Sequence, residues 1–564
     1  MRRGLRASWL LKAAGIGAVF GLIAVPSLGA SPVEKAPPNS PQQFAEGSSA
    51  SSSNVLGKLS AGPLTRRLVA HPEQAPAASQ DGYRTLRDLS AKPATPTDSG
   101  LQAGVSGSLR GQRLNDDRLG LPQNEESIAR CTSRPNVVLG GTNDYRGLLD
   151  PQGNFTGWHF STDGGRTLKN EGLLPAINFG GGNMIPSGGD PINVAGRNCA
   201  LFAGSLNYDP ADFFPNGVGL YKTTPRRLSI CPGGNSSYCW PHRKVVVKAD
   251  DPHKFLDKPW IYVSKGFVWV VYTEFICPDI GCAGNYSSNS IKAVRCRTDL
   301  RNCTAPILIS GNQRSIQFGD VTIGPDGRTY ITWEQDNDFA TNFGPPEHMK
   351  FWLRVAPPGS LNFGPARLVA RERKNLGIAT LHANDFRVGT YPKNTVKTVN
   401  GRPRVYVVWD GCRARPLGGS VCEEPAIKMR YSNDKGRTWT RTKVLSARGD
   451  NYFPTISANQ GGRQLAVAWY TNRFDPVFHN RQDVELATVS RNGTVRNRQR
   501  LTTTSNETEA DPLLGGTFIG DYIEVVALDD KALVHYNANY RSTKLLGSGF
   551  AVPQQDNFLA RRGL

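Results

Sequence analysis

The sequence lacks the short motifs that mark many enzyme classes. It has no G-x-S-x-G elbow, no phosphate-binding loop and no dinucleotide-binding fingerprint. It has neither C-x-x-C nor H-E-x-x-H, and its histidines are scattered without the spacing of metal ligands. These absences argue against an α/β-hydrolase, a nucleotide-dependent enzyme and a zinc peptidase.

Long apolar segments and blocks of charge are also scarce. Nothing in the sequence resembles a multi-pass membrane protein, a heptad array or a long amphipathic helix. The net charge is +20, but the basic residues are spread among turns and form no nucleic-acid-binding motif. We therefore expect no nucleic-acid partner. The basic surface either favours acidic glycans or an anionic cell envelope, or is simply well solvated.

The N-terminal region is typical of an export signal followed by a spacer. Three arginines among the first six residues precede an apolar stretch, Ala13–Leu28, which ends near Ala30. We predict a signal peptide over residues 1–30. Leu28 stands where a small residue is preferred, so an uncleaved membrane anchor is the alternative. Residues 31–115 are rich in Ser, Ala, Pro and Gln, which predicts a disordered spacer.

The ten cysteines indicate an oxidising destination, and we expect a secreted, periplasmic or cell-surface protein. Eight of them form close pairs, which suggests disulfides that staple loops and hairpins. The pairs are Cys231/Cys239, Cys277/Cys282, Cys296/Cys303 and Cys412/Cys422, with Cys131 and Cys199 left over. The alternative is a zinc site made of Cys277, Cys282, Cys296 and Cys303.

Seven short apolar runs, each opened by an acidic or amide residue, recur at an almost constant spacing. Successive openings are separated by 65, 67, 63, 65, 67 and 69 residues. The openings are Glu125, Asp190, Asp257, Asp320, Asp385, Tyr452 (next to Asn451) and Asp521. A long period built of strands and turns is typical of a β-propeller, in which each repeat is one sheet around a central axis.

The third repeat shows how each period divides into strands. DKPWIYV and FVWVVYTEF form two strands joined by a turn, and two further strands are expected around Ser290–Cys296 and Ala305–Ile309. The predicted fold is all-β, a propeller over residues 116–564 with about seven four-stranded blades, and six blades are the alternative.

The last repeat is expected to supply three strands. They are Tyr522–Ala527, Ala532–Tyr536 and Gly549–Pro553. The fourth strand is expected just before Asn124, so that pairing of the two ends of the propeller closes the ring and leaves no exposed edge.

A second motif marks turns at multiples of the same period. STDGGRTL (Ser161–Leu168) and SNDKGRTW (Ser432–Trp439) fit the pattern S-x-D-x-G-x-T-W, and RTDLRNCT is a degenerate copy. Its aspartates, Asp163, Asp299 and Asp434, are 136 and 135 residues apart, which is two periods each. The glycine permits a tight turn, and the aspartate accepts hydrogen bonds from turn amides.

This turn resembles the Asp-box of bacterial neuraminidase repeats. The chain from about Asn124 onward is therefore similar to a sialidase-like β-propeller, a family in which the box is structural. The resemblance implies that Asp163 and Asp434 are turn residues and not catalysts. Sialidases have six blades, so the count of seven departs from the family pattern.

Blade topology predicts which residues share a face. The start of the first strand and the end of the second lie on one rim, whereas the Asp-box turns lie on the other. Acids, arginines and aromatic residues on one concave rim suit a sugar, although a regular ring of acids also suits a scaffold. The non-repeated members, which we favour as functional, are Arg146, Glu274, Glu334, Arg473, Tyr522, Tyr540 and Arg541.

The resemblance also implies a chemistry, because sialidases use an arginine triad, a tyrosine nucleophile with a glutamate activator, and an aspartate acid/base. The candidates for carboxylate binding are Arg146, Arg473 and Arg541. The catalytic candidates are Tyr522 or Tyr540 as nucleophile, Glu274 as activator and Asp257 as acid/base. Glu334, Tyr540 and Trp469 complete the predicted substrate-binding set.

The Arg-Ile-Pro motif that supplies one arginine of the sialidase triad is missing, which speaks against activity on sialic acid. The first hypothesis is an exported sialidase-like glycoside hydrolase that acts on glycans. The alternative is a non-catalytic exported propeller that binds glycans or cell-envelope partners. We expect a monomer without a cofactor, and leave open whether calcium shapes the acidic rim.

Overall fold

The computed structural model describes residues 60–75, 77–90, 112–282, 286–336, 348–373, 381, 383–384, 386–413, 422, 424–459, 461–514, 518–545 and 551–564. The chain divides into two compact units, Met1–Pro38 and Asn39–Leu564, and every described residue belongs to the second. The predicted signal peptide and Asp385 lie outside the described residues.

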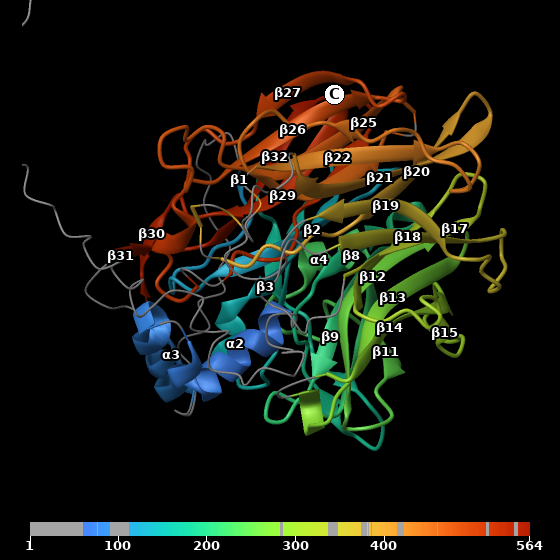
Figure 1. The fold of residues 1–564 in the computed structure, drawn as a ribbon. Helices are drawn as coiled ribbons and strands as arrows, with labels where there is room; N and C mark the ends of the chain where they lie inside the picture. The colour runs from blue at the N-terminus through green and yellow to red at the C-terminus, as the bar shows by residue number, and fades with distance from the viewer. Residues whose placement is uncertain are drawn as a thin grey trace, which may run out of the picture. The chain divides into compact units, whose positions relative to one another are not determined.

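Seven four-stranded antiparallel sheets form the blades of a β-propeller (Figure 1). From the inner to the outer strand, blade one consists of β2 (Gln123–Arg130), β3 (Val138–Asp144), β4 (Thr156–Ser161) and β5 (Asn170–Leu173). Blade two consists of β8 (Ile192–Ala195), β9 (Leu201–Tyr208), β10 (Asn216–Thr223) and β11 (His242–Lys248). Blade three consists of β12 (Lys254–Ser264), β13 (Phe267–Ile276), β14 (Ser288–Arg297) and β15 (Ile307–Leu308). Blade four consists of β16 (Ile316–Ile323), β17 (Thr329–Gln335), β18 (His348–Ala356) and β19 (Arg367–Arg373). Blade five consists of β20 (Lys393–Val399), β21 (Arg402–Cys412), β22 (Pro425–Ser432) and β23 (Lys443–Val444). Blade six consists of β24 (Asn451–Ala458), β25 (Gln464–Thr471), β26 (Asp483–Ser490) and β27 (Val495–Arg500). The seventh is β28 (Glu524–Leu528), β29 (Lys531–Ala538), β32 (Asp556–Gly563) and β1 (Gln112–Arg113).

The two ends of the propeller close the ring, as the sequence predicted. Strand β1 pairs with β32, with Arg113 opposite Phe558, and Figure 1 shows these two strands side by side. The inner strand of each blade neighbours the next, and β28 neighbours β2. The seven-blade prediction is confirmed and the six-blade alternative is wrong. The third strand of the last blade was placed wrongly, because Ala551–Pro553 (β31) forms a separate hairpin with β30 (Ser542–Lys544).

The apolar core is divided among the interfaces between neighbouring blades. In one such interface Tyr406 and Val408 of blade five pack against Leu465 and Val467 of blade six. Sheets stacked face to face bury one side of every strand in this way, which explains the alternation of β-branched and aromatic residues in the repeats.

Three buried tryptophans occupy equivalent places near the ends of second strands. They are Trp333, Trp409 and Trp469 in blades four, five and six. Each indole N–H donates a hydrogen bond, to Gln313, Glu372 and Asn451 respectively. Burying an aromatic ring while satisfying its polar group is how tryptophan contributes to a core. Trp469 therefore packs inside the propeller rather than lining an open rim.

The turns at Ser161–Leu168 and Ser432–Trp439 share one hydrogen-bonded geometry. Asp163 accepts from the amides of Arg166 and Thr167, at 2.8 and 3.0 Å, and from the Thr167 hydroxyl at 2.7 Å. In the second box Asp434 accepts from the Thr438 amide at 2.9 Å and from its hydroxyl at 2.7 Å. These contacts make both aspartates turn residues, as the resemblance implied.

All ten cysteines are paired in disulfides. The four predicted close pairs are present, and Cys131 bonds to Cys199. Residues 131 and 199 are 68 residues apart, so this fifth bridge joins equivalent turns of blades one and two. The zinc alternative is wrong, because its four cysteines form two disulfides. Five disulfides are typical of proteins that mature in an oxidising compartment.

Part of the predicted spacer is helical. Helices α2 (Ala61–Ala70) and α3 (Ala77–Ser90), joined by the turn η1 (Pro72–Gln74), pack on the propeller. Leu64, Leu68 and Tyr83 are buried against propeller residues that include Tyr145 and Leu513. The prediction of a disordered spacer is therefore wrong for residues 60–75 and 77–90, because their few apolar side chains form a common core with propeller residues.

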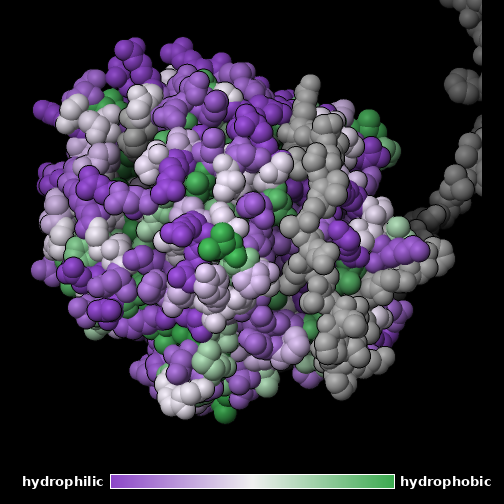
Figure 2. Space-filling model, turned by 180° about the vertical axis from the view of Figure 1, so that it is seen from behind, coloured by the Kyte–Doolittle hydropathy of each residue, from purple (hydrophilic) through white to green (hydrophobic). Residues whose placement is uncertain are grey.

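The surface of the molecule carries little apolar area on the face drawn in Figure 2. Among the described residues visible there, hydrophobic ones appear mostly singly among hydrophilic ones, which is normal for a protein surface. Among the described helices, none is long and apolar enough to cross a membrane.

Candidate functional site

Four carboxylates and two cations meet near the propeller axis, on the face where the inner strands begin. We call this group the axial acid cluster, and its members are Glu125, Asp190, Asp257, Asp521, Lys258 and Arg387. All six side chains are buried. They come from the starts of five different blades, so it is ring closure that brings them together.

Bulges at the starts of the inner strands position this cluster. In four blades the register of the first strand shifts at its start. Glu125, Asp190 and Lys258 have φ angles of 61°, 54° and 49°, a conformation that side-chain-bearing residues adopt rarely. A bulge re-aims a side chain, and such backbone persists where surrounding structure holds it. The acidic or amide residue that opens each repeat in the sequence therefore marks the position of this bulge.

Lys258 lies among three carboxylates of the cluster. Its Nζ is 3.3 Å from Glu125 Oε1 and 4.0 Å from Asp190 Oδ1, and it is in closer contact with Asp521 Oδ2. Burial alone lowers the pKa of Lys258, but the neighbouring carboxylates, Asp190 first, raise it above its usual value. Lys258 is therefore a fixed positive charge at the centre of the cluster.

Asp521 is the member of the cluster that is paired with Arg387. Arg387 binds it with two nitrogens, Nε at 3.2 Å and Nη2 at 2.6 Å. Burial raises the pKa of Asp521, but Arg387, Lys258 and a hydrogen bond from Tyr391 outweigh burial and lower it below the usual value. Paired geometry of this kind gives a guanidinium–carboxylate contact its strength.

Asp190 and Asp257 lie on either side of one hydroxyl group. Ser60, which immediately precedes α2, places its Oγ 2.5 Å from Asp190 Oδ2 and in shorter contact with Asp257 Oδ1. Two oxygens that both bond the same hydroxyl are at most about 5 Å apart. A hydroxyl carries one proton, so both contacts are hydrogen bonds only when one carboxyl is protonated. The other oxygens, Asp190 Oδ1 and Asp257 Oδ2, are buried without a hydrogen bond.

The cluster holds carboxyls in different protonation states. Burial raises the pKa of Asp257 to about 6, although Lys258 and the Ser60 hydroxyl oppose this. Burial, helped by the charges of Asp190 and Asp521, raises the pKa of Glu125 well above its usual value. Carboxyl groups whose pKa values are pushed apart within one site are the usual arrangement for acid/base chemistry.

The predicted nucleophile Tyr522 lies in an aromatic layer next to the cluster. Its hydroxyl donates to the carbonyl oxygen of Pro191 at 3.1 Å, and its ring meets Trp260 edge-on at 5.5 Å. Burial, followed by carboxylates such as Glu125, raises the pKa of Tyr522 well above 10. The predicted Tyr–Glu pair is not formed, because Glu274 accepts a hydrogen bond from Lys292 at 2.6 Å instead.

The three predicted arginines do not meet at the cluster. Arg146 is buried between Asp144 and Glu171, at 2.6 and 3.1 Å. Arg473 pairs with Glu485 at 2.6 Å, and Arg541 is exposed after β29. Each of the first two already has a carboxylate partner within the protein, so they form structural ion pairs.

The remaining predicted residues are divided between core and rim. Tyr540 packs edge-on against Phe558 at 5.0 Å, and burial raises its pKa well above 10. Glu334 is buried at the end of β17, where its charge acts on Tyr391. Asp257 is thus the predicted catalytic residue that lies within the axial acid cluster.

Sequence reasoning missed Ser60, Lys258, Arg387 and Asp190 as site residues. Lys258 had a visible signal, because it is the cation beside Asp257 in a repeat opening that otherwise carries acids. Ser60 had none, since it lies in a Ser-rich segment that resembles a spacer. In the described part of the chain, no group of three or more His, Cys, Asp or Glu side chains is arranged to hold a metal ion.

No protein-family model matches this chain, and no curated protein matches it in sequence. Among solved structures it is similar to an α-L-arabinanase from Penicillium chrysogenum, with 10% identity, a TM-score of 0.39, and coverage of 80% of this chain and 98% of that one. It is similar to a protein of unknown function from Dyadobacter fermentans, with 12% identity, a TM-score of 0.42, and coverage of 82% and 100%. It is also similar to a Hadza microbial sialidase, with 12% identity, a TM-score of 0.38, and coverage of 71% and 73%. Likenesses this distant do not identify reacting residues.

Proposed function

We propose that this protein is a glycoside hydrolase that reacts at the axial acid cluster, with Asp190 as nucleophile and Asp257 as acid/base. The observation that carries the proposal is the Ser60 hydroxyl, which is bonded by both carboxyls at once. A separation of at most about 5 Å lies near the 5–5.5 Å that is typical of retaining glycosidases, and well short of the spacing in inverting ones. The proposed product therefore keeps the anomeric configuration of the substrate.

In the first step Asp257 donates its proton to the glycosidic oxygen as the bond from that oxygen to the anomeric carbon breaks. Asp190 attacks the anomeric carbon and forms a glycosyl ester. In the second step the Asp257 carboxylate takes a proton from water, which attacks the same carbon and releases Asp190. Burial raises the pKa of Asp190, but the positive charge of Lys258 opposes this shift, and the Lys258 amide donates a hydrogen bond to Asp190 at 3.1 Å. Both contacts with Lys258 favour the ionised form of this nucleophile.

This assignment keeps Asp257 in the role expected from the sequence and moves the nucleophile from Tyr522 to Asp190. A tyrosine whose pKa is raised well above 10 is a poor nucleophile at neutral pH, whereas Asp190 has a neighbouring cation. Asp257 Oδ2, which is buried without a hydrogen bond, can bind a hydroxyl group of a sugar.

Entry of a substrate requires Ser60 to leave the cluster. Its hydroxyl oxygen stands where an oxygen of the sugar would bind, and α2 holds it there. Thr65 donates to the Tyr145 hydroxyl at 3.0 Å, and Arg66 bonds the carbonyl of Gly153. We therefore propose that α2 and α3 form a removable cover over the reacting groups.

A panel of 4-methylumbelliferyl glycosides, including α-sialosides, uronides, pentosides and hexosides, tests the proposal. We expect turnover of at least one substrate, loss of turnover in Asp190→Asn and Asp257→Asn, and retention of the anomeric configuration by proton NMR. Asp250→Asn, at an exposed aspartate, is the matched control. Tyr522→Phe tests the nucleophile expected from the sequence, because it should keep most of the activity.

Two results would contradict the proposal. Activity that survives Asp190→Asn but is lost in Tyr522→Phe would return the nucleophile role to the tyrosine. Absence of turnover, even after the helices are cleaved from the propeller, combined with binding on a glycan array, would favour the non-catalytic propeller.

A further inference from the structure

The axis holds a second site, a cavity beyond the aromatic layer that borders the acid cluster. Its volume is about 250 Å³, and all seven inner strands line it. Trp260 and Tyr522 belong to the layer between the two regions, where the remaining space, about 10 Å³, is no larger than one water. The proposed hydrolysis makes no use of this cavity.

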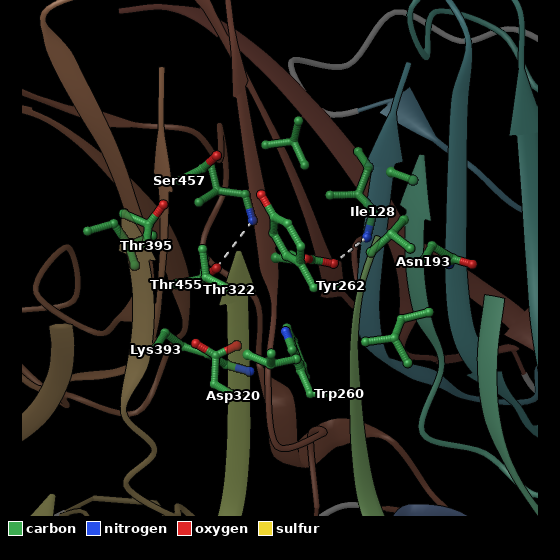
Figure 3. A pocket seen from close by; sticks show the side chains of 18 of the residues that line it. Ile128, Asn193, Trp260, Tyr262, Asp320, Thr322, Lys393, Thr395, Thr455 and Ser457 are labelled. Carbon is green, nitrogen blue, oxygen red and sulfur yellow. Dashed lines mark hydrogen bonds between the residues drawn. The ribbon is translucent and has the colours of Figure 1, made fainter. Parts of the chain in front are cut away.

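Lys393 is the charged group of this cavity that lacks a polar partner. Its side chain is more than nine-tenths buried, and Figure 3 shows it with Asp320 and Trp260 at one end of the cavity. Among the described residues, no carboxylate lies within 4 Å of its Nζ, and no hydrogen bond is formed. Its close contact is the ring face of Trp260, with the Nζ 2.9 Å from the ring centroid.

Buried ammonium groups without a hydrogen-bond acceptor are uncommon, because burial removes the water that would otherwise solvate them. Burial lowers the pKa of Lys393 to about 8, against the opposing charge of Asp320. The group is therefore still mostly charged at neutral pH, with three N–H donors that the protein leaves unused.

Two further groups that line the cavity, Glu524 and Tyr262, can donate a hydrogen bond to a ligand. Glu524 accepts from the Ile128 amide at 2.7 Å, and burial raises its pKa to about 8, so its carboxyl carries a proton at neutral pH. The Tyr262 hydroxyl has no hydrogen bond within the described residues, and Figure 3 shows its side chain in the middle of the cavity. Asp320 is already occupied, because its Oδ2 accepts from the amide and side chain of Asn394 at 2.5 and 2.8 Å.

We propose that this axial cavity binds a small monovalent carboxylate, with Lys393 as its ion partner. A carboxylate supplies the acceptors that the ammonium, the Tyr262 hydroxyl and the Glu524 carboxyl lack. The fixed charge of Asp320 disfavours a divalent anion such as phosphate. The volume admits a small ligand, whose apolar part contacts Trp260 and Tyr262.

Binding of butyrate by the purified full-length chain tests this proposal. Butyrate is not a sugar, so the outcome does not depend on the proposed hydrolysis. Isothermal titration calorimetry at pH 7 is expected to give a dissociation constant of about 0.1–1 mM. 1-Butanol, which lacks the carboxylate, and inorganic phosphate, which is partly divalent at this pH, should bind at least ten times more weakly.

Lys393→Met removes the ion partner, and we expect at least a tenfold loss of butyrate affinity. Lys244→Met, the same change at a half-buried lysine of β11 whose Nζ donates to the carbonyl of Arg301, should leave affinity unchanged. Circular dichroism and the melting temperature establish that both variants are folded. Tyr262→Phe is a milder variant, and a loss of a few fold is expected.

A measurement on the unaltered chain covers the case in which Lys393→Met does not fold. Acetylation of Lys393, followed by peptide mass spectrometry, should be slowed at least tenfold by 10 mM butyrate, while Lys244 is unaffected. The proposal is overturned by the absence of butyrate binding, by equal binding of phosphate, by unchanged affinity in folded Lys393→Met, or by unprotected Lys393.

Discussion

Two lysines are buried near the same axis in opposite environments. Lys258 has three carboxylates within 4 Å, which raise its pKa above the usual value. Lys393 has a tryptophan face and a cavity, and burial lowers its pKa to about 8. The difference shows that burial does not decide the state of a lysine by itself, since the groups around it determine whether the charge is held or left unsatisfied.

The two regions differ in the same way in what they offer a ligand. The acid cluster has carboxyls in excess of its cations and is covered by a serine from the N-terminal helices. The cavity offers the Lys393 ammonium, which has no carboxylate within 4 Å among the described residues. We therefore expect chemistry on hydroxyl groups at the first region and binding of an anion at the second.

The largest expected effect is on the nucleophile. Asp190→Asn removes the attacking carboxylate with little change in shape, and we expect kcat/KM to fall by about 10⁴-fold or more. Added azide should restore part of the activity by entering the space beside the anomeric carbon. Rescue that yields a glycosyl azide of the configuration opposite to that of the substrate identifies Asp190 as nucleophile, whereas a mere tenfold loss contradicts that role.

The acid/base role of Asp257 predicts a pH dependence. Its carboxyl must carry a proton for the first step, and its pKa is about 6, so kcat/KM should fall as pH rises through about 6. Asp257→Asn should lower kcat/KM by about 10²–10⁴-fold for substrates with poor leaving groups. Dinitrophenyl glycosides have leaving groups that need no protonation, so the value of kcat/KM for these substrates should fall much less. An alkaline limb that persists unchanged in Asp257→Asn would assign it to another group.

The contrast between the two lysines is tested by one substitution made twice. Lys258→Met leaves three buried carboxylates without their cation, and we expect the free energy of unfolding to fall by about 3–5 kcal/mol. Lys393→Met removes an unsatisfied charge and should not lower the free energy of unfolding. Urea unfolding followed by circular dichroism measures both, and equal destabilisation of the two variants would remove the basis of the comparison.

Lys393 also predicts how stability depends on pH. Its pKa in the folded state is about 8, below its usual value, so the folded protein releases this proton at lower pH than the unfolded chain. Its contribution to the free energy of unfolding should therefore rise between about pH 8 and 10.5, by at most about 3 kcal/mol. Subtracting the pH profile of the unfolding free energy of Lys393→Met from that of the unaltered chain isolates this contribution. A difference that does not change with pH would show that the lysine is solvated.

The smallest effect is expected from release of the helical cover. A protease site inserted between α3 and β1 allows the helices to be cut from a chain that folded with them in place. We expect cleavage to raise kcat/KM by about tenfold, which corresponds to about 1.4 kcal/mol. Ser60→Ala, without cleavage, should give a smaller rise, because the helices remain docked by Leu64, Leu68 and Tyr83. An unchanged rate after complete cleavage would show that the cover does not restrict access.

The propeller fold and the positions at which its blades begin could be predicted, because both follow from local sequence patterns. The 65-residue spacing, the alternating strands and the Asp-box turns each depend on nearby residues, and the cysteine pairs with short separations did so as well. The Cys131–Cys199 bridge was left unassigned, because its partners are 68 residues apart and become neighbours through the packing of two blades.

The candidate site was predicted only in part. Asp257 lies in the axial acid cluster. Arg146 and Arg473 were chosen by residue type, and the structure gives each a carboxylate partner from its own blade. Whether an arginine is free depends on the side chains of strands that pair with it, and no local pattern carries that information.

The sequence by itself determined the number of blades, the rim on which their first strands begin and the turns on the opposite rim, because these follow from short-range periodicity and turn chemistry. Tertiary structure decided which charges meet. Glu125 and Asp521 are 396 residues apart in the chain, yet both bind Lys258, because a closed ring brings the first and last blades together. Electrostatic energy depends on distance in space, so the protonation states of the acid cluster and the isolation of Lys393 exist only in the folded propeller.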